Sequence, residues 1–286
     1  MTTAIIADIH GNIEALESVL SDMDFYRPER IIVLGDIIGY GPNPKECLDR
    51  VFESTGEILI GNHEANILWP DPDMDIERDL LQWTEDHTKE SKYWNLFEEK
   101  SKALTKNEMA TLISEGMTYV HASAAEPVEQ YIWPAHKVQY IIFNDQIDAR
   151  LGEFLDEFKT QIGFCAHTHA PAVLTQYSNK KIFDPYENTA DWNRESTFVG
   201  PNHIFFVPDG GMELKNIGDS KMVINPGSVG QPRDGNRYAS YAIYEPGRII
   251  INRVSYDYRK TQQKISEMPI KEETRNYMAL RLQRAK

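Results

Sequence analysis

Cysteine is scarce in this sequence. Its 286 residues include two, Cys47 and Cys165, which lie far apart and form no CxxC motif. We therefore expect neither a disulfide scaffold nor a thiolate zinc site. A chain so poor in cysteine suits a reducing compartment, and we predict a cytoplasmic location.

Long hydrophobic runs are also missing. The first apolar run, residues 4–7, ends at Asp8 before the hydrophobic core of a signal peptide could form. No other run approaches the roughly 20 apolar residues that a membrane helix needs. The sequence therefore predicts a soluble protein with no membrane partner.

Positive charge is in deficit. Lys and Arg total 30 against 44 Asp and Glu, which gives a net charge of −14. This sign excludes general nucleic-acid binding through the phosphate backbone. The basic residues concentrate in residues 259–286, where eight Lys or Arg face three Glu. We interpret this segment as a solvated C-terminal helical tail, with a partner-binding tail as the alternative.

The first 60 residues alternate between strand and helix patterns. Short apolar runs predict strands at residues 4–7, 31–34 and 57–60. Asn12 can cap a helix after the first strand, and Asn43 with Pro44 can open a helix after the second. This order with short connections predicts a parallel sheet with right-handed crossovers.

The middle of the chain changes character. Residues 65–116 carry apolar side chains at helical spacing and predict a helical insertion. Its last helix has a capping box at Thr105 and Glu108, and we expect Gly116 to end it. Further strands are predicted at 117–120 and 162–165, with a helix over residues 137–158 between them.

The remainder is mostly strand. The predicted strands are residues 173–177, 204–207, 221–224, 238–244 and 249–256. We expect a second sheet here, with residues 178–202 as an excursion over the surface. Repeats and long linkers are absent, so we predict one α/β domain over residues 1–286 with a two-sheet core.

Metal-binding residue types follow the predicted strands at their carboxyl ends. They are Asp8 and His10, Asp36, Asn62 and His63, His121, and His167 and His169. Each motif alone also fits an ordinary turn or surface loop. Because ligand sites of open α/β sheets collect at the carboxyl ends of strands, we expect these side chains to converge.

The donor types narrow the chemistry. Carboxylate, imidazole and amide oxygen without thiolate favour Mn, Fe or Zn over Cu(I) or an iron–sulfur cluster. Two Asp, four His and one Asn are too many for one ion with an open position, but they suit two ions that share a bridging carboxylate. Two such ions would make a locally cationic pocket, so the net charge does not set the sign of the substrate.

These motifs together resemble a known family signature. The sequence contains Asp8-Ile9-His10, Gly35-Asp36, Gly61-Asn62-His63-Glu64, His121, His167-Thr168-His169 and the later run Asn225-Pro226-Gly227-Ser228-Val229-Gly230. The series resembles the calcineurin-like metallophosphoesterases, and in appearance their small bacterial and archaeal phosphodiesterase-like branch. The resemblance implies a four-layer α/β/β/α sandwich with a two-metal site at one edge.

The resemblance also implies a ligand set. Asp8, His10, Asp36 and His169 would hold one ion, and Asp36, Asn62, His121 and His167 the other. Asp36 would bridge the two. The expected cofactor is a pair of divalent ions, Mn²⁺ first, with Fe, Zn or Ni as alternatives.

The implied activity is hydrolysis of phosphodiester or nucleotide-type substrates. A hydroxide bridging two cations would attack phosphorus, and His63 would act as general acid or as a donor to the developing oxyanion. Asp36 and Asn62 would complete the catalytic group. A symmetrical dinucleoside tetraphosphatase and a phosphomonoesterase are alternatives. A scaffold resembling the retromer subunit of similar fold is disfavoured, because all seven ligand positions and His63 are present.

Two departures from the family pattern stand out. Ala166 replaces the glycine that usually precedes the His-x-His motif, so the turn there must be one that a Cβ permits. The residues after Asp36 lack the Asp and Arg that the Ser/Thr protein phosphatases carry. Activity of that branch is therefore not expected.

Substrate contacts are the least specified part of the site. The expected partner is a small phosphorylated molecule, and the sequence carries no signal of oligomeric state. Candidates for binding it are Asn62, Arg233, Arg237 and Tyr40, with Trp69 and Trp133 as further rings that could stack on a base. For the two arginines a solvent-facing turn is the alternative, and for the aromatic rings ordinary packing.

Overall fold

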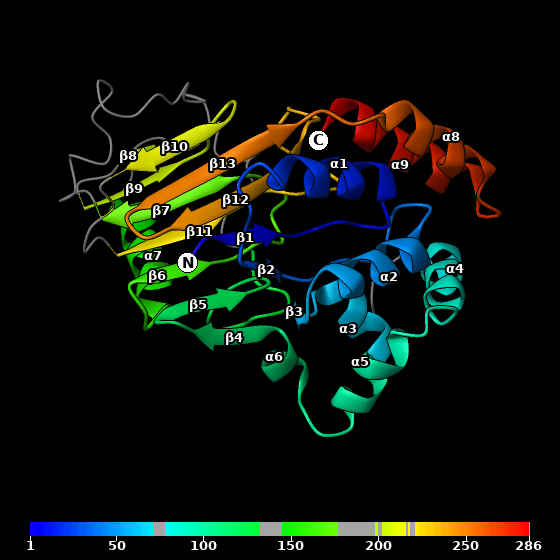
Figure 1. The fold of residues 1–286 in the computed structure, drawn as a ribbon, viewed down its shortest axis with the longest axis horizontal. Helices are drawn as coiled ribbons and strands as arrows, with labels where there is room; N and C mark the ends of the chain where they lie inside the picture. The colour runs from blue at the N-terminus through cyan, green and yellow to red at the C-terminus, as the bar shows by residue number, and fades with distance from the viewer. Residues whose placement is uncertain are drawn as a thin grey trace.

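The fold is built on two sheets. We describe a computed structural model, which covers residues 1–70, 78–131, 145–176, 198–199, 202–215, 217 and 221–285. The first sheet has the strand order β10-β13-β12-β1-β2-β3 and the second β4-β5-β6-β11-β7-β9-β8 (Figure 1). Strands β1, β2 and β3 run parallel, as do β5, β6 and β11.

The strands of the first sheet are β1 (Thr3–Ile6), β2 (Arg30–Val33), β3 (Glu57–Ile58), β10 (Met212–Lys215), β12 (Ala239–Glu245) and β13 (Arg248–Val254). Those of the second are β4 (Thr111–Ser114), β5 (Met117–Val120), β6 (Ile162–Phe164), β7 (Ala172–Gln176), β8 (Phe198–Val199), β9 (His203–Phe206) and β11 (Met222–Asn225). The helices are α1 (Ile13–Met23), α2 (Pro44–Ser54), α3 (Asn62–Leu68), α4 (Arg78–Thr88), α5 (Trp94–Ser101), α6 (Lys106–Met109), α7 (Asp145–Glu157), α8 (Tyr258–Glu267) and α9 (Glu272–Arg284).

The two sheets face each other between layers of helices. In β1, Ala4 and Ile6 point to the cluster shared with α1 and α2, and Ile5 points into the apolar core between the sheets. Alternation along a strand that is buried on both faces explains why this segment reads as one apolar run. A third cluster joins the outer face of the second sheet to α7. The four-layer α/β/β/α sandwich is confirmed.

We had expected the strands after residue 172 to form a second sheet of their own. This prediction was wrong, because they are divided between the two sheets. Strands β10, β12 and β13 join the first sheet, where β12 pairs antiparallel with β1. Strands β7, β9 and β11 complete the second. Strand propensity is local, whereas the choice of partner strand depends on the packing of the whole core.

The helical region ends earlier than expected. Helix α6 is one turn long and closes the predicted capping box, since Thr105 accepts from the Glu108 N–H. Residues 111–114 then form β4, which pairs antiparallel with β5, and Gly116 lies in the connecting turn at φ +74°. The expected helix end at Gly116 was wrong, because this glycine serves a hairpin instead.

Of the two predicted N-terminal capping residues, one makes a capping hydrogen bond and the other does not. The Asn12 side chain accepts from the Ala15 N–H and caps α1. Pro44 begins α2, but the Asn43 side chain makes no capping bond and instead accepts from Lys264 Nζ at 2.8 Å. This contact links α2 to the C-terminal helices.

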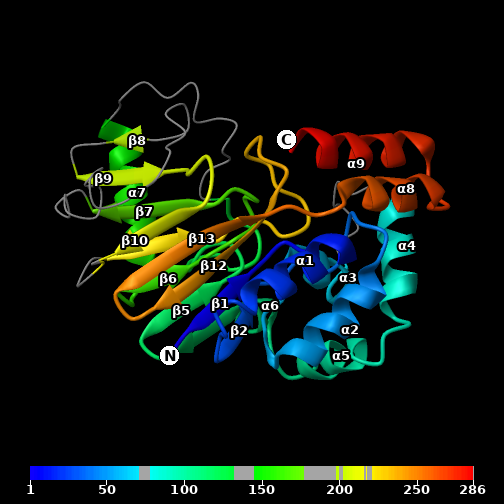
Figure 2. The same ribbon diagram turned by 45° about the horizontal axis from the view of Figure 1, so that its top comes forward.

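The C-terminal segment forms two helices, α8 and α9, that pack beside α4 (Figure 2). Leu80 of α4 shares an apolar cluster with Ile265, Met278 and Leu282, and Tyr40 packs against it. Most of residues 178–202, residues 137–144 of the predicted helix, and Trp133 lie outside the described residues. Among the described residues, no helix is long and apolar enough to cross a membrane.

Candidate metal centre

The predicted ligands converge at the carboxyl ends of the strands. Asp8 and His10 follow β1, Asp36 follows β2, Asn62 begins α3 after β3, His121 follows β5, and His167 and His169 follow β6. Six of them form two groups whose ligand atoms lie within 4.8 Å of one another, and both groups contain Asp36. The groups are Asp8, His10, Asp36 and His169, and Asp36, His121 and His167.

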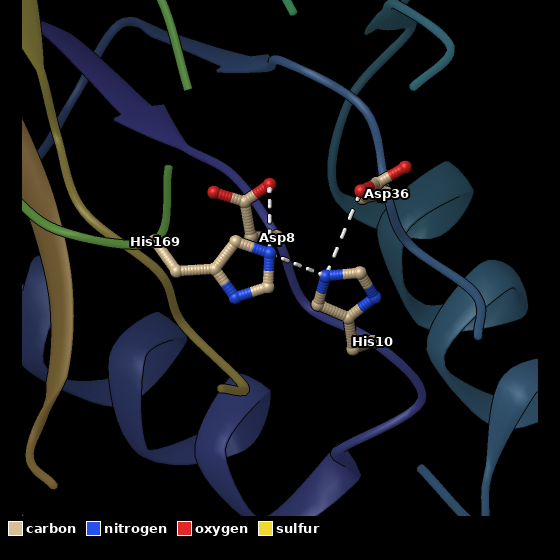
Figure 3. Close-up of side chains that lie close together, drawn as sticks. All are labelled: Asp8, His10, Asp36 and His169. Carbon is tan, nitrogen blue, oxygen red and sulfur yellow. Dashed lines mark hydrogen bonds and ion pairs between the residues drawn. The ribbon is translucent and has the colours of Figure 1, made fainter. Parts of the chain in front are cut away.

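The first group is compact (Figure 3). The Nε2 atoms of His10 and His169 are 3.0 Å apart. His10 Nε2 lies 3.6 Å from Asp36 Oδ2, and His169 Nε2 lies 3.9 Å from Asp8 Oδ1. Four donors from three separate loops thus surround one point.

The second group is arranged around His121. Its Nε2 atom lies 3.2 Å from His167 Nδ1 and 3.4 Å from Asp36 Oδ2. The Asn62 side-chain oxygen is 3.3 Å from the same nitrogen, so the amide lies beside this group. Among the residues that the structure describes, Asp36 is therefore the carboxylate that belongs to both groups.

Backbone carbonyls fix the orientation of three of the imidazole rings. The bonds join Nδ1 of His10 to Ile38 O at 3.1 Å, of His121 to Leu34 O at 2.8 Å, and of His169 to Gln231 O at 2.7 Å. A carbonyl can only accept, so each Nδ1 carries the proton. In the neutral ring, Nε2 then presents its lone pair to the centre.

The donor atoms need a cation. Two unprotonated Nε2 atoms at 3.0 Å repel each other unless a positive charge lies between them. Both carboxylate oxygens of Asp8 are buried and have no hydrogen-bond partner among the described residues. Buried carboxylates are normally paired or bound to metal. The residues present therefore fit divalent ions.

Burial controls protonation in the centre. It lowers the pKa of His10, His167 and His169 well below the usual range and that of His121 to about 4. These rings are neutral at pH 7, which is the form that binds metal. Burial also raises the pKa of Asp8 and Asp36, and a nearby cation would offset that effect.

The loops that carry the ligands hold unusual backbone conformations. Positive φ values occur at Asp8 (51°), His10 (48°), Asp36 (53°), His167 (65°) and His169 (58°). Such values are uncommon outside glycine, and they concentrate at functional sites. Ala166 is not among the positive-φ residues, so its Cβ is tolerated and the expectation for this turn is confirmed.

Glu64 supports the Asp36 loop. Its buried carboxylate accepts hydrogen bonds from the backbone N–H groups of Asp36, Ile37, Ile38 and Gly61. Burial and the nearby Asp36 charge raise the pKa of Glu64 to about 7. The motif Gly61-Asn62-His63-Glu64 contained this residue, but spacing alone gave it no role.

Residues 225–231 support the other loops. Ser228 Oγ donates to Asp8 O at 2.7 Å and accepts from the Gln231 N–H at 2.8 Å. The Asn225 amide donates to Ala166 O at 3.0 Å. This segment therefore fixes the loops after β1 and β6 relative to each other, a role that the sequence motif did not reveal.

His63 lies beside the centre. Its backbone N–H donates to Asp36 Oδ1 at 3.0 Å, and its ring packs on His10 and Tyr40 with centroids 4.8 and 4.7 Å away. A Cβ on Gly39 would lie 2.1 Å from His63 Nδ1, so this approach requires glycine. Burial lowers the pKa of His63, and the charge of Asp36 opposes that shift.

Only some of the residues predicted to contact substrate lie beside the centre. Tyr40 packs edge-on against His10, with centroids 4.9 Å apart, and the Arg233 guanidinium lies 5.8 Å from the Tyr40 ring centroid. Arg237 is exposed and lies over the ring of Tyr258, the first residue of α8, with its guanidinium 4.6 Å from the ring centroid. Trp69 packs against the core.

Sequence reasoning missed one aromatic ring. Tyr131 stacks on His167 with centroids 4.0 Å apart, and 51% of it is exposed. No motif pointed to it, because its place beside the centre depends on the fold of the segment after β5.

Comparison with known proteins identifies the family. The family model described as "Calcineurin-like phosphoesterase" matches residues 1–171 of this chain. The chain belongs to the calcineurin-like phosphoesterase family. The crystal structure of a metallophosphoesterase from Sphaerobacter thermophilus is 30% identical with a TM-score of 0.71, and the match covers 100% of this chain and 99% of that one.

Two further relatives extend the comparison. An uncharacterized protein of Methanocaldococcus jannaschii is 28% identical over 277 residues, which cover 92% of this chain and 90% of the relative. A symmetrical bis(5'-nucleosyl)-tetraphosphatase of Psychromonas ingrahamii is 33% identical over 72 residues, about a quarter of each chain (24% and 26%). Family and geometry together are consistent with a dinuclear divalent metal site in a phosphoester hydrolase.

Proposed function

We propose that this protein is a dinuclear-metal-dependent phosphoesterase that acts on phosphodiester or nucleotide-type substrates. The observation that carries the proposal is the position of Asp36, whose carboxylate borders two clusters of neutral imidazoles. A carboxylate in this position can serve as a ligand to both of two adjacent divalent cations.

In this proposal the residues divide as follows: Asp8, His10, Asp36 and His169 hold one ion, and Asp36, Asn62, His121 and His167 hold the other. We propose Mn²⁺, with Fe, Zn or Ni as alternatives, because the donor set has no thiolate. When bound at these residues, divalent ions would supply Lewis-acid chemistry: they would polarise phosphoryl oxygens and make water more acidic.

The chain itself supplies binding and proton transfer. The Asn62 amide and the Arg233 guanidinium contact phosphoryl oxygens, and Tyr40 packs beside them. His63 donates a proton or a hydrogen bond to the leaving oxygen, because its ring lies against His10 and its backbone is fixed by Asp36. Burial lowers the pKa of His63, and the negative charge of Asp36 favours the protonated ring. The backbone contact keeps the ring at the centre while its side chain remains free to donate.

The deciding experiment combines metal content with hydrolysis. Mass spectrometry of the Mn²⁺-loaded protein should find about two metals per chain. The loaded protein should hydrolyse bis-p-nitrophenyl phosphate, with p-nitrophenyl phosphate as the monoester comparison. His63→Ala should lower turnover by roughly 10²-fold to 10⁴-fold while both metals remain bound.

The matched control is His87→Ala. His87 is a half-buried histidine on α4 that stacks on Trp83 and belongs to neither ligand group. Its loss should leave turnover within about twofold of wild type. A protein that cannot bind two equivalents of metal, or a His63→Ala variant as active as wild type, would contradict the proposal.

A symmetrical dinucleoside tetraphosphatase is the second candidate. Two observations favour it: the half-exposed Tyr131 ring at the centre, and the similarity over 72 residues to a protein of that name. It would cleave a dinucleoside tetraphosphate into two nucleoside diphosphates. Chromatography of the products, compared with those from a cyclic nucleotide and a simple diester, separates this candidate from a general phosphodiesterase.

A further inference from the structure

Two arginines from distant parts of the chain, Arg233 and Arg281, lie beside the histidine centre, by which we mean the two ligand groups described above. Gln231 Oε1 accepts from Arg233 Nη2 at 2.8 Å and lies 3.4 Å from Arg281 Nη1, which also donates to it. Arg233 belongs to the loop after β11, and Arg281 belongs to α9. One amide oxygen thus holds two guanidinium groups near each other.

The loop of Arg233 is part of the centre. The Arg233 N–H donates to His169 O at 3.0 Å, and Gln231 O accepts from His169 Nδ1 at 2.7 Å. An ion pair between Asp234 and Arg253 holds the next residue of the loop. The position of this arginine is therefore set by the same backbone that orients a predicted metal ligand.

Helix α9 reaches the centre by packing. Met278 and Leu282 are buried against α8 and Leu80, and they line a small cavity together with His10 and Tyr40. The Gly235 N–H donates to Ala285 O at 2.9 Å and ties the loop to the end of α9, two segments that lie side by side in Figure 2. Arg281, one residue before Leu282, is thereby fixed at the edge of the centre.

The charge of Arg233 acts on the buried carboxylates of the centre, where it opposes the rise in the pKa of Asp8 and Asp36 that burial causes. Neither Arg233 nor Arg281 forms an ion pair with a carboxylate of the described residues, whereas Arg30, Arg248 and Arg253 all do. Two neighbouring cations repel each other, and an anion placed between them removes that cost.

We infer that Arg281 and Arg233, joined through Gln231, form a binding subsite for a second phosphoryl group next to the one that is cleaved. The preferred substrates then contain a diphosphate or longer phosphate chain rather than an isolated phosphoester. Guanidinium forks match the paired oxygens of such a group. This inference rests on the proposed function, and it assigns α9 a role in specificity.

The test is a binding measurement on the full-length, Mn²⁺-loaded protein. Isothermal titration with methylenediphosphonate, which cannot be hydrolysed between its phosphorus atoms, is compared with titration by inorganic phosphate, both with Mn²⁺ in excess. Wild type should bind the diphosphonate at least about tenfold more tightly than phosphate. Arg281→Gln should reduce that preference about tenfold, and Arg281→Lys should reduce it less, since it keeps the charge and loses the fork.

The matched control is Arg284→Gln, which removes the same charge from an exposed position of the same helix and should keep the wild-type preference. An unchanged preference in Arg281→Gln, or an equal loss in Arg284→Gln, would overturn the subsite. If the protein hydrolyses no phosphoester but Arg281→Gln still abolishes the preference, the proposed function fails and the subsite stands. If hydrolysis is normal and the preference ignores Arg281, the function stands and the subsite fails.

Discussion

The histidine centre and the helical rim, which we define as α4, α8 and α9, are built on opposite principles. In the centre, buried polar side chains are held by backbone groups, and five ligand candidates have positive φ. In the rim, amphipathic helices bury Leu80, Ile265 and Leu282 and leave charged residues outside. Geometry is fixed by hydrogen bonds in one region and by apolar contact in the other.

This difference indicates that the centre mainly determines activity and that the rim mainly determines stability. A polar centre with uncompensated charge opposes folding, so other parts of the molecule must stabilise it. The rim adds apolar burial and brings Arg281 to the centre from the far end of the chain. Substitutions in the centre should therefore act first on activity, and substitutions in the rim first on stability.

The sharpest test of this contrast is Asp36→Asn. The amide removes the charge that both clusters share, so we expect metal content to fall from about two per chain to about one or fewer. Hydrolysis of bis-p-nitrophenyl phosphate should fall at least about 10³-fold. Asp156→Asn, an exposed control on α7, should change neither quantity.

In the rim, Leu282→Ala should cost about 2–5 kcal/mol of unfolding free energy, because it leaves a cavity in the cluster of α4, α8 and α9. Urea unfolding followed by circular dichroism measures this loss. Leu280→Ala on the same helix is the control, since Leu280 is 44% exposed and should have little effect. Equal losses in the two variants would show that α9 is not docked as described.

Ser228→Ala probes the support of the centre. It removes the hydroxyl between Asp8 O and the Gln231 N–H, leaving a buried donor unpaired at a cost of about 1–3 kcal/mol. Turnover should fall as well, because both loops carry predicted ligands. The control is Ser266→Ala on α8. Ser266 is exposed, so its loss should change neither the stability nor the turnover. Lower stability with full activity would mean that the loops hold their geometry without this bond.

The smallest expected effect is the pH dependence of α8 docking. Burial tends to raise the pKa of Glu14, but its hydrogen bond and ion pair with Lys264 at 2.6 Å outweigh burial and lower it from about 4.5. A lowered folded-state pKa gives stability that is present above pH 4.5 and is lost as the pH falls through the folded value.

Glu14→Gln should therefore destabilise the protein by about 1 kcal/mol at pH 7. The difference in Tm from wild type should shrink as the pH falls below 4.5. Glu53→Gln, at an exposed position on α2, is the control and should show no such trend. A difference that stays constant with pH would mean that the ion pair does not contribute to docking.

Much of the centre could be predicted because the signal is local. Asp8, Asp36 and His121 follow apolar strands, and parallel strands bring their carboxyl ends to one edge. Predictions of features that depend on contacts between distant segments were wrong. Residues 111–114 became β4 through pairing with β5, and β12 joined β1 across more than 200 residues of sequence, a choice that no local pattern contains.

The arginines show the same limit. Arg233 and Arg237 looked alike in the sequence, since both lie in one polar loop, but the fold brings Arg233 to Tyr40 and places Arg237 over Tyr258. Arg281 looked like part of a solvated tail. Its place beside Gln231 follows from the burial of Met278 and Leu282.

The sequence by itself determined the donor types, their order and their strand context, because short runs of residues fix strands, turns and side-chain chemistry. It therefore pointed to a two-metal site, and the resemblance of its motifs to a known family pointed to a phosphoesterase. Only the tertiary structure decided which strands pair, which buried groups support the ligands and which cations reach the centre. Those features depend on contacts between segments that are far apart in the chain, and the free energy of such contacts is set by packing of the whole core.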